Sequence, residues 1–150
     1  MIVVPDASVF NKLFLDEPDR QHAVDLFAHC IKADFDLVAP DILRYEVMSV
    51  AMRFGIPFAF VHDILDVQRS AGLRLFEPSL KVLQRAEAIA TSGHEKSGYP
   101  DLHDSIYQAL ALELGGIFVT ADRRHFAKTK AFGGIALLQD WRDVLGLTQR

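Results

Sequence analysis

Short apolar runs alternate with longer segments of helical periodicity along this sequence, and that alternation limits the folds open to it. The runs expected to form strands are residues 2–4, 36–39, 117–119 and 135–138. Each is apolar on successive positions, as in a strand that is buried on both faces. Strands separated by helices predict an α/β fold whose central sheet is mostly parallel, with four or five strands.

The spacing of apolar residues predicts helices between these runs. They are expected at residues 7–15, 20–32, 58–70, 79–91 and 102–114, with one more that opens at Pro40-Asp41 and ends before Gly55. Residues 73–76 are interpreted as a weak link between two helices, and residues 92–100 as a loop by composition. Gly115-Gly116 marks a helix end. No repeat or linker interrupts the pattern, which predicts a single domain over residues 1–150.

Composition excludes several classes of protein. The chain is 50% hydrophobic and 24% charged, which is ordinary for a folded protein. Its one cysteine, Cys30, allows no internal disulfide and no cysteine-based zinc site. The N-terminus lacks the basic region of a signal peptide, and no apolar run is long enough to cross a bilayer. We therefore expect a cytoplasmic protein that makes no contact with a membrane.

The formal net charge of −4 gives the chain no general attraction for polyanions. A nucleic-acid partner is compatible with that charge only if some of the acidic residues hold divalent cations, because a bound cation inverts the local charge.

Four acidic residues fall where a parallel sheet brings its strand ends and the following helix starts to one edge. They follow the first strand, enter the helix after the second, open the helix after Pro100, and follow the third strand: Asp6, Glu46, Asp104 and Asp122. Ligands of such sheets bind beyond the carboxyl ends of the strands. We therefore expect the four carboxylates to converge.

Each acid also has a purely structural interpretation. Asp6, Asp104 and Asp122 stand where acids cap helices or complement the helix dipole, and glutamates such as Glu46 are commonly solvated. Asp41 and Asp101 stand at expected helix starts and are the more natural caps. If they do the capping, Glu46 and Asp104 are left for another role.

A carboxylate cluster without cysteine or a histidine pair suits Mg²⁺ or Mn²⁺, which prefer hard oxygen ligands. Without the metal the carboxylates repel one another and some of their pKa values rise. With it, the site can activate a water and stabilise the departing oxygen in phosphodiester hydrolysis.

Four segments in order resemble PIN domains, in particular the VapC toxins of bacterial toxin–antitoxin pairs. The segments are VVPDASVF (3–10), LRYEV (43–47), HDSIYQALA (103–111) and VTADRR (119–124). No one segment is specific, but their order and separations agree over essentially the whole chain. His103 and Pro5 depart from the usual pattern, and neither departure removes an acid.

The resemblance implies a Rossmann-like three-layer α/β/α sandwich and a Mg²⁺- or Mn²⁺-dependent endoribonuclease that hydrolyses RNA. It implies metal binding and catalysis by Asp6, Glu46, Asp104 and Asp122, with the Ser8 and Thr120 hydroxyls supporting the first and last aspartates. It also implies a homodimer and a small VapB-like antitoxin whose C-terminal segment blocks the site.

Three further features have two interpretations each. A basic run either holds RNA phosphates or forms a solvated face: Arg123, Arg124, Lys128 and Lys130. Lys12 either reaches the rim of the site or does not take part, and Asp101 is either a helix-start residue or an extra acid. An aromatic and aliphatic group is interpreted mostly as core, with some of it forming an apolar groove for a partner helix: Phe54, Phe58, Phe60, Val61, Ile64 and Leu65.

Two other functions remain open from the sequence. One is a catalytically idle PIN-like module that binds a protein partner. The other is an α/β phosphoryl-transfer domain with Asp6 as nucleophile, although such chemistry usually places a second aspartate where Ser8 stands, or pairs the first with a lysine.

Overall fold

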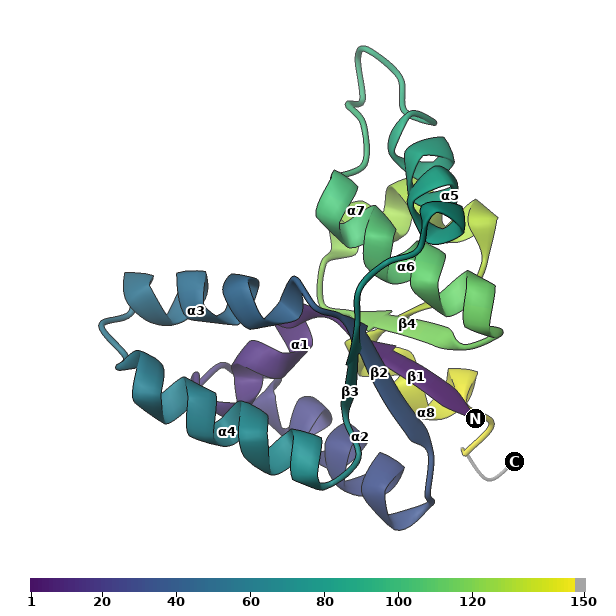
Figure 1. Cartoon of the computed structure of the whole chain (residues 1–150). Helices are drawn as coiled ribbons and strands as arrows, with labels where there is room; N and C mark the ends of the chain where they lie inside the picture. The colour runs from purple at the N-terminus through teal and green to yellow at the C-terminus, as the bar shows by residue number, and fades with distance from the viewer. Residues whose placement is uncertain (148–150) are drawn as a thin grey trace.

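Five parallel strands form the centre of the protein in a computed structural model that describes residues 1–147 (Figure 1). The strands are β1 (Ile2–Pro5), β2 (Asp36–Pro40), β3 (Arg74–Phe76), β4 (Ile117–Thr120) and β5 (Ile135–Leu137). Their order across the sheet is β3-β2-β1-β4-β5, and every neighbouring pair is parallel. The expected α/β fold with a mostly parallel sheet is confirmed.

Helices cover both faces of this sheet, which gives the three layers of an α/β/α sandwich. Helix α6 (Leu102–Leu114) packs on β1, β2 and β4, with α5 (Leu80–Ala90) against it. Figure 1 shows α1 (Ala7–Phe10), α2 (Arg20–Lys32) and α8 (Trp141–Val144) on the opposite side. The central strands are buried between the layers because their side chains are apolar on both faces, as at Val3, Val4, Phe118 and Val119.

The sheet order places β1 at the point where the chain changes direction. From β1 the chain adds β2 and β3 on one side, and it later returns to add β4 and β5 on the other. The helices that follow adjacent strands on the two sides diverge at such a point and leave a crevice beyond the strand ends. Asp6, the first residue after β1, stands at this crevice.

The sequence predicted most helices well and missed some short elements. Helices α2, α6 and α4 (Phe58–Ser70) have the expected bounds, and α6 ends at Gly115 in the left-handed conformation (φ 67°) that glycine adopts most readily. The helix expected at residues 7–15 is α1 followed by a 3₁₀ turn at Asn11–Leu13. The interpretation of residues 73–76 as a mere link was wrong, because Arg74–Phe76 pairs with β2 as the edge strand β3.

Helices α3 (Leu43–Arg53) and α4 form a hairpin that extends away from the sheet in Figure 1. Phe54, Phe58 and Phe60 are 64%, 51% and 53% exposed, so the prediction that this group is mostly core was wrong for its aromatic members. Val61 and Leu65 are buried against the rest of the protein. The hairpin therefore presents apolar surface on its outer side.

The other described elements are α7 (Arg123–Thr129) and 3₁₀ turns at Lys130–Phe132 and Leu138–Asp140. Among residues 1–147, no helix has both the length and the apolar character needed to cross a membrane.

Candidate active site

The four carboxylates predicted to converge do line one cavity. It has a volume of about 530 Å³ and lies at the carboxyl end of β1, between α3 and the start of α6. Asp6, Glu46, Asp104 and Asp122 all face it, from segments that are far apart in the chain. Ser8 and Asn11 also line it, and two basic side chains, Arg53 from α3 and His103 from α6, do so as well.

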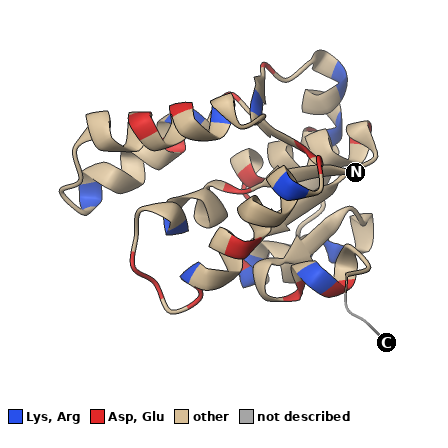
Figure 2. Cartoon of the chain, turned by 90° about the horizontal axis from the view of Figure 1, so that it is seen from below, with Lys and Arg blue, Asp and Glu red and all other residues tan. Residues whose placement is uncertain are grey.

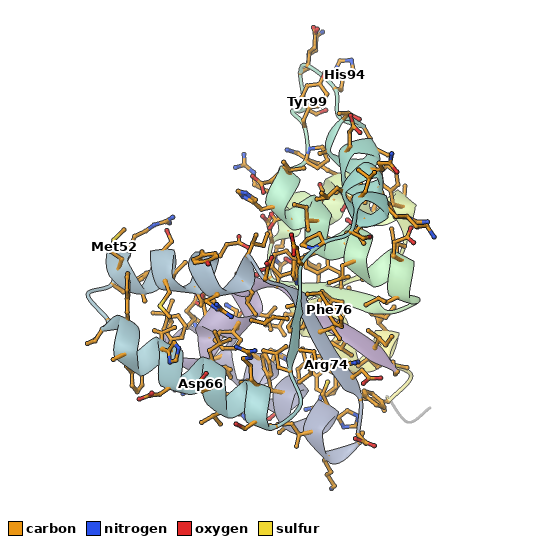
Figure 3. The ribbon with its side chains drawn as sticks, viewed as in Figure 1. Met52, Asp66, Arg74, Phe76, His94 and Tyr99 are labelled. Carbon is orange, nitrogen blue, oxygen red and sulfur yellow. The ribbon has the colours of Figure 1, made fainter. Side chains whose placement is uncertain are left out.

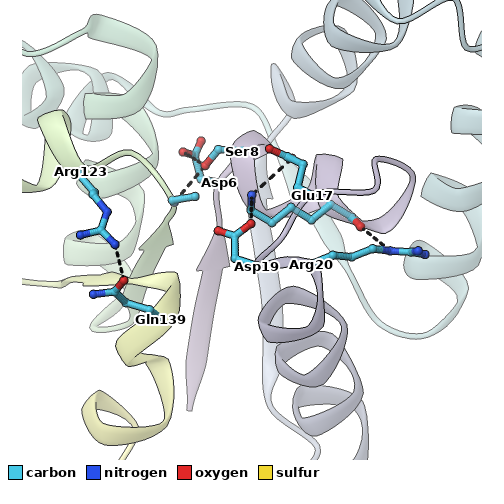
Figure 4. A network of polar contacts seen from close by, with 9 residues as sticks. Asp6, Ser8, Glu17, Asp19, Arg20, Arg123 and Gln139 are labelled. Carbon is cyan, nitrogen blue, oxygen red and sulfur yellow. Dashed lines mark hydrogen bonds and ion pairs between the residues drawn. The ribbon is translucent and has the colours of Figure 1, made fainter.

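Asp6 is held by two hydroxyl groups. Its side chain is buried, and Oδ2 accepts hydrogen bonds from Ser8 Oγ and from Thr120 Oγ1, each at 2.7 Å. The same hydroxyl oxygens accept the backbone N–H groups of Ala121 (3.1 Å) and Asp122 (3.0 Å). Ser8 and Thr120 thus lie beside Asp6 and join β1 to the turn after β4; Figure 4 shows part of this network.

Glu46 is oriented by a residue that the sequence did not single out. Tyr107 Oη donates to Glu46 Oε1 at 2.8 Å, from the buried face of α6. Tyr107 follows Asp104 by three residues, so both stand on the same side of that helix. Burial is the main cause that raises the pKa of Glu46, and the hydrogen bond from Tyr107 partly lowers it again. This spacing was the one sequence signal that pointed to Tyr107.

Asp122 and Asp101 are both helix caps. Asp122 Oδ1 accepts the N–H groups of Arg124 (2.9 Å) and His125 (3.0 Å) at the start of α7, and the side chain lines the cavity as well. Asp101 Oδ1 accepts the N–H of Asp104 at 3.2 Å, as expected of a helix-start residue. The prediction that Asp41 caps the helix after β2 was wrong, because no side chain caps the start of α3.

Burial and mutual repulsion disfavour full ionisation of the cluster. Burial, followed by the charges of Asp6 and Asp101, raises the pKa of Asp104 to about 8. Burial also raises the pKa of Asp6, against the two hydroxyl bonds that favour its charged form. A cluster of this kind holds a proton near neutral pH unless a cation replaces it.

The carboxylates share a cavity without forming a finished coordination shell. Within residues 1–147, no three carboxylate, imidazole or thiolate side chains stand close enough together to hold a metal ion. The donor set nevertheless fits a hard cation, because all four acids present oxygen. Within residues 1–147, no group donates a hydrogen bond to Glu46 Oε2 or to Asp122 Oδ2, so these two oxygens are free to bind a cation.

One further polar group at this cavity was missed. Asn11 is buried, lines the cavity, and its Oδ1 has no hydrogen-bond partner among the described residues. It lies one helical turn beyond Ser8, and this spacing is the sequence signal that could have indicated it.

The basic residues near the site behave differently from one another. Lys12 is buried and pairs with Asp19 (2.7 Å) and Glu17 (3.4 Å), both labelled in Figure 4. It does not line the carboxylate cavity, but it lines a neighbouring one that also includes Ser8 and Asp122. Arg123 donates to Gln139. Figure 2 shows basic and acidic positions interspersed along the ribbon rather than gathered on one side.

Comparison with known proteins agrees with this architecture. PAE2754 from Pyrobaculum aerophilum superimposes with a TM-score of 0.60 at 19% identity, over 99% of this chain and 100% of that one. FitAcB from Neisseria gonorrhoeae superimposes with a TM-score of 0.56 at 16% identity, over 94% and 99%. At these identities the likeness is one of fold. No curated protein sequence matches the chain.

The sequence itself carries the family assignment. Residues 3–131 match the PIN domain, a span that includes all four carboxylates of the cavity. The chain belongs to the PIN domain family.

Proposed function

We propose that this protein is a metal-dependent endoribonuclease that hydrolyses RNA phosphodiester bonds with Mg²⁺ or Mn²⁺. The observation that carries the proposal is the meeting of Asp6, Glu46, Asp104 and Asp122 around one cavity at the point where the sheet changes direction. PIN domains are generally nucleases, which favours phosphodiester hydrolysis as the reaction.

The metal would be held by these four carboxylates. Such an ion supplies a polarised water and stabilises the charge that develops on the departing oxygen. The protein's own part is to fix the ligands: Ser8 and Thr120 hold Asp6, and Tyr107 holds Glu46. A bound cation relieves the repulsion that raises the pKa of Asp104. Metal binding therefore favours deprotonation of the carboxylates, and their deprotonation favours metal binding.

Within this proposal the protein is the VapC-like toxin of a type II toxin–antitoxin system and works in the cytoplasm as a homodimer. The exposed apolar surface of the α3–α4 hairpin favours the binding of a protein partner. A cavity of about 500 Å³ there is almost wholly apolar, and it is lined by Arg44, Tyr45, Met48, Phe58, Ala59 and His62. Apolar surface of this kind suits a VapB-like antitoxin helix or a second copy of the chain.

A phosphoryl-transfer role for Asp6 has less support. Its Oδ2 is engaged by two hydroxyls, and among the described residues no lysine lines the cavity. An idle binding module remains the rival, and a cleavage assay separates it from the nuclease.

The test is cleavage of a labelled single-stranded RNA by purified protein with Mg²⁺ or Mn²⁺. We expect Asp6→Asn and Asp104→Asn to lose at least about a hundredfold in rate while remaining folded. Glu113→Gln is the matched control, because Glu113 pairs with Lys81 and Arg85 away from the cavity. Equal rates in all variants would assign the cleavage to a contaminant, and absence of cleavage by the parent protein would favour the binding module.

A further inference from the structure

A second cavity adjoins the carboxylate cavity and shares two residues with it. Its volume is about 730 Å³, within the range of roughly 300–1,000 Å³ that is usual for ligand sites. Asp104 and Asp122 line both cavities, and the remaining wall comes from residues 95–102 and from α7. A chain-like ligand that crosses the carboxylates can therefore continue directly into the second cavity.

This second cavity contains three basic side chains that form no ion pair with the acids that also line it. Lys96, Arg124 and Lys128 line it, and within residues 1–147 none of them forms an ion pair. Arg124 and Lys128 are four residues apart on α7, so they project from the same face of the helix. Glu95 and Asp101 also line the cavity, which leaves the α7 side as the place where a phosphate is favoured.

An aromatic residue of the loop, Tyr99, lines the same cavity. Tyr99 is 53% exposed, and Figure 3 shows it on the loop that extends beyond α7. The ring packs directly on Gly93, where a Cβ atom would lie only 2.6 Å from Tyr99 Cδ1. Lys128 Nζ donates to the Tyr99 carbonyl at 3.3 Å, and a bridge between His94 and Gly98 closes the loop. The loop is therefore held against α7 with the ring partly open to solvent.

We infer that this cavity binds one nucleotide of a single-stranded RNA, next to the bond that is cut. Arg124 and Lys128 hold the phosphate, and the base stacks on Tyr99. Cations beside an exposed aromatic ring are the combination by which proteins bind single strands, since stacking on a ring needs a base that is unpaired. The inference rests on the proposed ribonuclease function and names the form of its substrate.

An acidic peptide is the competing ligand. It would use the same cations, but it has no requirement for an aromatic ring or for continuity with the carboxylates. Both of those features favour a nucleotide, and the experiment below separates the two ligands.

The experiment measures binding of a fluorescein-labelled RNA hexamer by anisotropy, in Asp104→Asn protein so that cleavage does not interfere. Adding Arg124→Ala or Tyr99→Ala should weaken binding about tenfold, whereas Tyr99→Phe should bind as the parent does. Arg124→Ala and Lys128→Ala should each lower the slope of log affinity against log salt by about 0.7. Arg69→Ala and Phe60→Ala, which alter exposed side chains of α4 outside both cavities, are the matched controls and should change nothing.

A set of hexamers with one abasic position each tests the stacking contact directly. We expect one abasic position to weaken binding to protein that has Tyr99 and to have no further effect in Tyr99→Ala protein, because the two changes remove the same contact. Unchanged RNA affinity and salt slope in the Arg124 and Tyr99 variants would overturn the inference. Binding of an acidic peptide that is lost in Arg124→Ala and Lys128→Ala protein, while these variants keep the RNA affinity of the parent, would assign the cavity to a protein partner.

Failure of this inference is distinguishable from failure of the proposed function. If the parent protein cleaves RNA but Tyr99→Ala leaves RNA affinity unchanged, the nucleotide site is rejected and the nuclease function is kept. Tyr99-dependent binding without cleavage by the parent would reject the nuclease and keep a single-strand binding site.

Discussion

The buried carboxylate of Asp6 is fixed by two hydroxyls, one from Ser8 in the first turn of α1 and one from Thr120 at the end of β4. A buried carboxylate without hydrogen bonds is costly, so each hydroxyl contributes to stability as well as to geometry. Thr120 Oγ1 does both, because it donates to Asp6 and accepts the N–H of Asp122. One atom thereby positions two acids of the cluster.

Replacing that hydroxyl tests the coupling. Thr120→Val keeps the shape of the side chain and should cost about 1–3 kcal/mol in the free energy of unfolding, because it leaves the Asp122 N–H without its partner and leaves Asp6 Oδ2 with one hydroxyl donor in place of two. Metal-dependent cleavage should fall about 10- to 100-fold. Urea denaturation and RNA cleavage measure the two effects.

Thr129→Val is the matched control. Thr129 is also buried, but its Oγ1 donates to the His125 carbonyl within α7. It should lose stability and leave the cleavage rate within about twofold of the parent. Equal loss of cleavage in both variants would show that Thr120 acts through general stability alone.

At the level of single residues, the sequence predicted acids and hydroxyls that directly follow strands and missed their distant partners. The roles of Ser8 and Thr120 were implied by the resemblance to PIN domains, through the segments VVPDASVF (3–10) and VTADRR (119–124). The bond from Tyr107 to Glu46 joins residues 61 positions apart, and neither its existence nor its direction follows from local spacing. Such contacts depend on how α3 and α6 pack.

Among the elements, α6 begins at a cap that lies beside the site without facing the carboxylate cavity. Asp101 Oδ1 accepts the Asp104 N–H, and this bond sets the first turn that carries Asp104. Asp101→Ala should destabilise the protein by about 1 kcal/mol, while Asp101→Asn, which can also cap, should cost only a few tenths. Thermal unfolding of the two variants measures the difference.

The same pair separates capping from metal binding. If Asp101 is a cap alone, the cleavage rate of Asp101→Asn should stay within about threefold of the parent. A loss as large as that of Asp104→Asn would identify Asp101 as an additional acid of the active site.

Elements with strong periodicity were predicted, and those whose structure depends on neighbours were not. Helices α2 and α4 follow from their own apolar spacing. Strand β3 is three residues long and half-exposed, and it is a strand only because β2 offers an edge to pair with. Helix α7 was not among the predicted helices: it is only seven residues long, with most of its charged residues exposed and only His125 and Thr129 buried on its inner side.

For the whole molecule, the carboxylate cluster of the candidate active site lowers the stability of the metal-free fold. The arrangement that brings four acids together also buries them, and the pKa of Asp104 rises to about 8 in the folded state. The folded chain therefore keeps a proton that the unfolded chain releases above about pH 4. The stability of the metal-free protein should fall as pH rises from about 4 to about 8, through this group.

Asp104→Asn should remove that dependence and stabilise the metal-free protein at pH 8 by about 1–2 kcal/mol, although the same change abolishes cleavage. Thermal unfolding in EDTA should show a midpoint roughly 3–6 °C above the parent at pH 8 and a smaller difference at pH 5. Comparing the two proteins at each pH cancels other groups, such as His125, whose pKa burial lowers and whose contribution has the opposite sign.

Addition of Mg²⁺ completes the test. A cation that binds the folded cluster stabilises the parent by RT ln(1 + [Mg²⁺]/Kd), and the gain should be larger at pH 8 than at pH 5, where protons compete for the carboxylates. Asp104→Asn should gain less at both pH values because it lacks one ligand. An equal Mg²⁺ effect in parent and variant, with no dependence on pH, would place the ion elsewhere on the protein and would leave the repulsion in this cavity unrelieved.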